Sequence, residues 1–109
     1  MMKHPIEVYV DPECALGYIR YLGEDAQFDG ALTLLRDSDG VVRDHAFCDV
    51  DYRWDGIHID VTPDDDIIGF EIIDVDDIEC VNLAREYAAA NDLAFPDDIR
   101  AAASRDPAA

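Results

Sequence analysis

Apolar and polar side chains alternate along much of the first two-thirds of the chain. Ile6, Val8 and Val10 recur at every second position, and this period of two predicts a strand with one buried face. Turn signals rich in Asp, Gly and Pro separate further segments of β-forming residues. The predicted strands are 6–10, 16–22, 32–36, 41–50 and 57–61. The segment Ile67–Ile73 is almost continuously apolar, which predicts a central strand buried on both faces.

The pattern changes from strand to helix after Asp74. The segment Ile78–Ala90 consists mostly of good helix formers and contains neither Gly nor Pro. Its apolar stripe, which should pack on the sheet, consists of Val81, Ala84 and Ala88, flanked by Cys80, Leu83 and Tyr87.

Capping signals suggest where the helices begin and end. Asp76 followed by Glu79 has the spacing of an N-cap and its reciprocal partner, so the first helix should run from about Asp76 to Asn91. Pro96 suits the first turn of a short second helix, and residues 103–109 are expected to form a frayed tail. Several strands precede any helix, and their connections are too short for helical crossovers. We therefore predict one α+β domain, with a mostly antiparallel sheet of about five or six strands.

Composition adds a strong charge to this picture. The chain has 26 acidic and 8 basic residues, a net charge of -18, and 50% of its residues are hydrophobic. Such a surface repels phosphates, which argues against direct nucleic-acid binding. It suits a basic protein partner, a cation or a salty solvent, although GC-rich coding would produce a similar composition. The three cysteines form no CxxC pair, and the sequence contains no membrane-span pattern, so we expect a cytoplasmic protein with free thiols.

The acidic residues are concentrated between Asp60 and Glu79, where no basic residue occurs. This concentration favours a non-enzymatic binding module, an inhibitor or antitoxin-like partner of a basic protein that could act as a DNA mimic. The residues predicted to bind the partner are Asp60, Asp64, Asp65, Asp66, Asp76 and Asp77. An alternative is a self-associating structural protein that forms homo-oligomers such as a homodimer. It would use an exposed sheet edge or the aromatic residues Phe47, Tyr52 and Trp54.

Candidates for chemistry are few. No segment has the ligand spacing of an EF-hand, and His45, Cys48 and His58 are better explained as a core cysteine and two surface histidines than as a zinc site. We therefore predict no metal and no cofactor. An acid–base enzyme centred on Glu71, with Asp60 and Asp74 nearby in sequence, is the third hypothesis. It competes with a structural role for Glu71 in an ion pair, for example with Arg20.

Gly69 lies inside the predicted central strand. A glycine at such a position commonly marks a bulge or the close approach of another group. We predict a structural role, with the helix stripe around Val81 and Ala84 as its neighbour.

Two segments resemble the domain of unknown function 2283 family. They are Ile59–Asp74 (IDVTPDDDIIGFEIID) and Val8–Arg20 (VYVDPECALGYIR). Gly69 and Glu71 fall on the positions that best define the family pattern, whereas the segment Gly23–Gly56 and the C-terminal helices depart from its compact form. The resemblance covers about residues 6–74. It implies strands around an acidic turn, no assigned catalytic activity, and similarity to small partners of toxin-like proteins.

Overall fold

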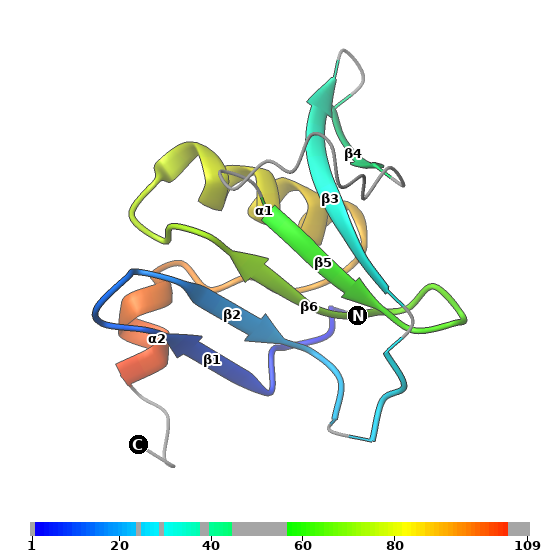
Figure 1. Ribbon diagram of the computed structural model, residues 1–109, viewed down its shortest axis with the longest axis horizontal. Helices are drawn as coiled ribbons and strands as arrows, with labels where there is room; N and C mark the ends of the chain where they lie inside the picture. The colour runs from blue at the N-terminus through cyan, green and yellow to red at the C-terminus, as the bar shows by residue number, and fades with distance from the viewer. Residues whose placement is uncertain (1, 24, 29, 38–39, 45–56, 105–109) are drawn as a thin grey trace.

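A six-stranded antiparallel sheet forms the centre of the molecule (Figure 1). The computed structural model describes residues 2–23, 25–28, 30–37, 40–44 and 57–104. In sheet order the strands are β1 (Glu7–Val10), β2 (Gly17–Arg20), β6 (Ile67–Ile72), β5 (Ile57–Val61), β3 (Gly30–Asp37) and β4 (Gly40–Asp44). The predicted class, an α+β domain with an antiparallel sheet and two helices, is confirmed.

The register places the most hydrophobic side chains on one face of the sheet. Phe70 on β6 lies opposite Ile19 on β2 and Ile59 on β5, and Ile72 lies opposite Ile57. These five side chains are the largest that are fully buried. β6 is thus an interior strand, as predicted, although Glu71 interrupts its buried run with a partly exposed side chain.

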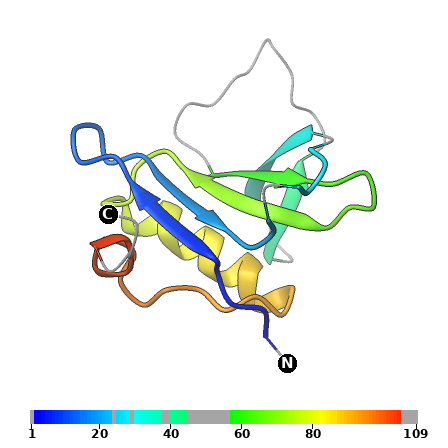
Figure 2. The same ribbon diagram turned by 90° about the horizontal axis from the view of Figure 1, so that it is seen from below.

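Both helices lie on this same face (Figure 2). Helix α1 (Ile78–Ala90) contacts β3, β4, β5 and β6, and the shorter α2 (Ile99–Ser104) contacts β1. The predicted stripe residues Val81, Ala84 and Ala88 are buried. The Phe70 ring meets three other rings edge to face, those of Tyr21, Tyr87 and Phe95. Aromatic burial therefore joins the sheet to α1 and to the segment that follows it.

Backbone hydrogen bonds tie the N-terminal segment to the chain beyond α1. The Lys3 N–H donates to the Asp92 carbonyl at 2.9 Å, and the Ala94 N–H donates to the Lys3 carbonyl at 2.8 Å. The Tyr21 hydroxyl donates to the Ala94 carbonyl at 2.7 Å. This pairing fixes Lys3 beside the end of α1.

The helix starts differ from the prediction. Asp77, not Asp76, is the N-cap of α1, because Asp77 has extended backbone angles and its carboxylate accepts from the N–H groups of Glu79 and Cys80. Asp76 instead binds Arg100. The second helix begins at Ile99 rather than at Pro96.

Strand lengths also differ in places. β2 is limited to Gly17–Arg20 within the predicted 16–22, and β4 ends at Asp44. The rest of the predicted strand 41–50 lies outside the described residues, as do His45, Cys48 and the predicted aromatic interface of Phe47, Tyr52 and Trp54.

Candidate functional site

Three consecutive carboxylates occupy the turn between β5 and β6. The Asp65 N–H donates to the Thr62 carbonyl, and the Thr62 N–H donates to the Asp66 carbonyl, each at 2.9 Å. The Asp66 N–H also donates to Thr62 Oγ1 at 3.1 Å. Asp65 has a left-handed φ of 69°, which Asp tolerates better than most residues. The turn therefore holds Asp64, Asp65 and Asp66 in a fixed, exposed arrangement.

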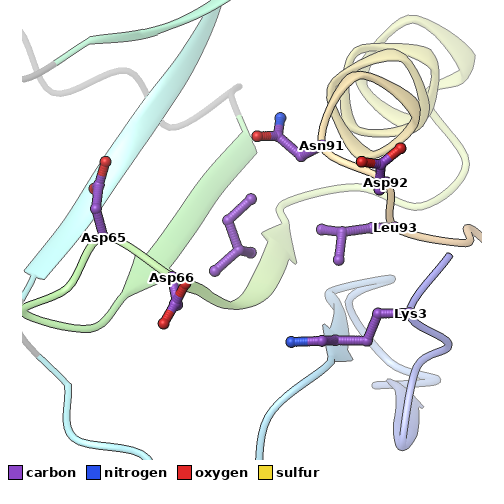
Figure 3. A pocket seen from close by; sticks show the side chains of 7 residues that line it. Lys3, Asp65, Asp66, Asn91, Asp92 and Leu93 are labelled. Carbon is purple, nitrogen blue, oxygen red and sulfur yellow. The ribbon is translucent and has the colours of Figure 1, made fainter. Parts of the chain in front are cut away.

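This turn faces the end of α1 across a hollow of about 290 Å³. We call it the acidic hollow; Figure 3 shows its lining, which consists of Lys3, Asp65, Asp66, Ile67, Asn91, Asp92 and Leu93. Asp92 has a left-handed φ of 58° where the chain leaves the helix. The last turn of α1 contains no basic residue, so the partial negative charge of the helix end adds to the field of the carboxylates. The hollow is thus electrostatically suited to a cation.

Three arginines whose side chains are described bind elsewhere in the molecule. Arg20 donates to Glu7 at 2.8 Å. Arg85 lies over the Phe95 ring, 5.3 Å from its centroid, and donates to backbone carbonyls of the following segment. Arg100 binds Asp76 through two hydrogen bonds of 2.9 and 2.8 Å. Lys3 is the single cationic side chain in the lining of the hollow.

The six predicted partner-binding residues do not form one patch. Asp64, Asp65 and Asp66 precede β6, whereas Asp76 and Asp77 follow it, so the two groups lie at opposite ends of the strand (Figure 1). The hydrogen bond from Arg100 lowers the pKa of Asp76, and the same pair raises the pKa of Arg100. Asp77 caps α1. The groups before and after β6 therefore have different surroundings, and the group before β6 adjoins the acidic hollow.

Asp60 lies on the sheet face opposite the helices. The Tyr18 hydroxyl donates to Asp60 Oδ2 at 2.8 Å. In the register Tyr18 is opposite Glu71, and Gly69 is opposite Arg20 on β2 and Asp60 on β5, so the Tyr18 side chain reaches Asp60 diagonally across Gly69. Burial raises the pKa of Tyr18, and the hydrogen bond to Asp60 raises it further. A Cβ at Gly69 would lie 2.6 Å from the Ile19 carbonyl oxygen and 2.8 Å from the Tyr18 Cζ and hydroxyl. The close neighbour of Gly69 is therefore β2, not the helix stripe that the sequence suggested.

Glu71 and Asp60 share this face but have different neighbours. Glu71 is opposite His58 on β5, with 3.7 Å between His58 Nδ1 and Glu71 Oε1, whereas Asp60 is opposite Gly69. The expected surface position of His58 is wrong, because His58 is only 5% exposed; it lies in a strand that has β6 on one side and β3 on the other. Glu71 and Asp60, two of the carboxylates of the enzyme hypothesis, are thus diagonal neighbours on β6 and β5.

Sequence reasoning missed the part of the hollow that comes from the ends of the chain. The sequence predicts that the helix ends at about Asn91, but no local pattern indicates that Lys3 pairs with Leu93, 90 positions away. Within the described residues, no group of three or more His, Cys, Asp and Glu side chains is placed to hold a metal ion.

Comparisons with known proteins identify no relative of this chain. No family model matches the chain, and neither a curated protein nor a solved structure matches it. The resemblance to the domain of unknown function 2283 family stays a prediction. In the part of the chain that the structure describes, no helix has the length and apolar character needed to cross a membrane.

Proposed function

We propose that this chain is a small acidic binding module, an inhibitor or antitoxin-like partner of a basic protein, that engages its partner at the acidic hollow. The observation that carries the proposal is the hollow itself, where Asp65 and Asp66 of the fixed turn lie across from Asp92 and the negative end of α1. A Lys or Arg side chain of the partner is a natural occupant because it would meet several carboxylates at once.

The charge of the whole chain supports the same proposal. A net charge of -18 steers a basic protein toward the surface and speeds association. Exposed ion pairs contribute little individually, about 0 to 1 kcal/mol each, so useful affinity requires several contacts around the hollow. Such contacts are screened by salt over a distance of about 8 to 10 Å. Binding should therefore weaken steeply as the salt concentration rises.

DNA mimicry is a related version of this proposal. The carboxylates would then stand in for phosphates and occupy a nucleic-acid groove on the partner. Duplex DNA added to the preformed complex would displace the chain if the partner uses that groove, and would leave the complex intact if it does not.

Pull-down from the native lysate at low and high salt tests the proposal. The wild-type chain is compared with Asp65→Asn/Asp66→Asn, which neutralises two carboxylates that line the hollow, and with a matched control, Glu79→Gln/Asp97→Asn, which neutralises two exposed carboxylates away from it. We expect a basic protein that the wild type and the control retain at low salt and that the Asp65/Asp66 variant loses. The assignment to the hollow would be refuted if no basic protein is recovered, if the recovered protein is retained equally at low and high salt, or if both variants lose the partner to the same extent.

A further inference from the structure

Strand β1 forms one edge of the sheet, with β2 as its single neighbouring strand. The Asp11 N–H donates to the Leu16 carbonyl at 2.8 Å, so Asp11 directs its backbone toward β2. Because backbone direction alternates along an antiparallel strand, Val10 and Val8 direct their N–H and C=O groups outward. In Figure 2, which views the molecule from below, β1 is the strand nearest the viewer.

This edge carries few of the features that prevent pairing. Natural sheets shield their edges with short strands, Lys, Pro, bulges, inward charges or a covering helix. β1 is four residues long and α2 contacts it, but it contains neither Lys nor Pro, and its one charged residue, Glu7, already binds Arg20 at 2.8 Å. The exposed large hydrophobic residues along and before this strand are Met2, Ile6 and Tyr9, at 46%, 56% and 52% exposure.

The segment that forms this edge has a small net charge. Residues 1–22 contain two basic side chains and three carboxylates, so they carry -1 of the total of -18. Two copies of this chain repel each other through their acidic surfaces, and this segment adds little to that repulsion. A basic partner is drawn instead to the acidic hollow, at a different part of the molecule.

We propose that β1 pairs with β1 of a second copy to form a closed, two-fold dimer with a continuous sheet. The outward groups fix an antiparallel register in which Val8 bonds the partner's Val10, and Val10 bonds the partner's Val8. Tyr9 then lies on the symmetry axis, opposite the partner's Tyr9, in a pair that exchanges no backbone hydrogen bonds. Side chains are closest in such pairs, so the two rings can meet on the open face.

Salt separates this dimer from the proposed partner complex. Salt screens the repulsion between two chains of charge -18 and so strengthens the dimer, whereas it weakens binding of a basic protein at the hollow. The two proposals rest on different residues, and either can fail without the other.

Sedimentation velocity of the full chain, over a range of protein concentrations at low and high salt, tests the dimer. The variant Tyr9→Lys places two ammonium groups opposite each other on the axis, and Phe28→Lys is a matched control, since Phe28 is 59% exposed and outside β1. We expect wild type and Phe28→Lys to dimerise, more strongly at high salt, and Tyr9→Lys to stay monomeric with an unchanged circular dichroism spectrum. The hollow variant Asp65→Asn/Asp66→Asn should dimerise at least as well as wild type.

Three results would overturn the proposal: a wild type that is monomeric under every condition, a Tyr9→Lys variant that dimerises as wild type does, or wild-type assemblies that grow beyond the dimer. A wild type that stays monomeric but pairs with an added extended peptide would assign the edge to a different occupant, which also overturns it.

Discussion

Replacing Gly69 with alanine should weaken the fold severely. The added Cβ would lie 2.6 Å from the Ile19 carbonyl oxygen and 2.8 Å from the Tyr18 ring and hydroxyl. The first obstacle is backbone in the neighbouring strand and cannot swing aside. The second can move only if Tyr18 gives up its 2.8 Å hydrogen bond to Asp60. The substitution therefore displaces part of the pairing between β2 and β6.

The magnitude follows from these two obstacles. Overpacking a well-packed site costs about 1 to 3 kcal/mol, and a hydrogen bond to a charged acceptor contributes about 1.5 to 3 kcal/mol. We expect Gly69→Ala to lower the free energy of unfolding by roughly 3 kcal/mol when the Tyr18 bond is partly lost. For a domain of this size, that change corresponds to a fall of roughly 10 to 20 °C in Tm.

Urea unfolding followed by far-UV circular dichroism measures this effect, and Gly23→Ala is the control. A Cβ at Gly23 would meet Asp25 Oδ1 at 2.9 Å, the free end of an exposed side chain that can turn away. The control should change stability by less than about 0.5 kcal/mol. If Gly69→Ala unfolds at the same urea concentration as wild type, or if both variants lose the same stability, the reasoning about β2 is wrong.

Three further substitutions test other contacts. Asp77→Ala removes the N-cap of α1 and should lower the free energy of unfolding in urea by about 1 kcal/mol, a larger loss than for Asp76→Ala. A larger loss for Asp76→Ala would instead support Asp76 as the N-cap, as the sequence predicted. Arg100 lowers the pKa of Asp76 below its ordinary value of 3.8, so this pair stabilises the fold above that value and stops doing so as the pH falls. The Tm difference between wild type and Asp76→Asn should therefore shrink on acidification, and a constant difference would contradict the pairing. The pKa of Tyr18 is raised above its ordinary value of 10.0, so the extra stability of wild type over Tyr18→Phe should be complete below pH 10.0 and should be lost as the pH rises further. A stability difference that persists at strongly alkaline pH would show that it does not come from the Asp60 hydrogen bond.

Local patterns predicted the elements of the fold well, because a strand or helix with one buried face imposes its own period on the sequence. The alternation at β1 and β5, the apolar run at β6 and the helical stripe on α1 each gave the correct type of element. The helix caps were less accurate. Asp76 and Asp77 are chemically identical, and the choice between them depends on Arg100, 24 positions away.

The acidic patch shows where sequence proximity fails. Asp66 and Asp76 are near in the chain, but the six residues of β6 lie between them, and a strand rises about 3.3 Å per residue. The two groups are therefore separated by roughly 20 Å of strand. Conversely, Lys3 and Asp92 line one hollow because the N-terminal segment pairs beside Leu93, a contact that no local pattern encodes.

NMR mapping with a basic probe tests the central claim most directly. A synthetic lysine-rich peptide is titrated into the ¹⁵N-labelled full chain at low salt, and the amide shifts are followed residue by residue. The account predicts that the largest shifts gather at Asp64–Asp66 and Asn91–Leu93, and that they vanish at high salt. Shifts of equal size over all exposed carboxylates, or shifts centred on Asp76 and Asp77, would contradict the claim that the acidic hollow is the binding site.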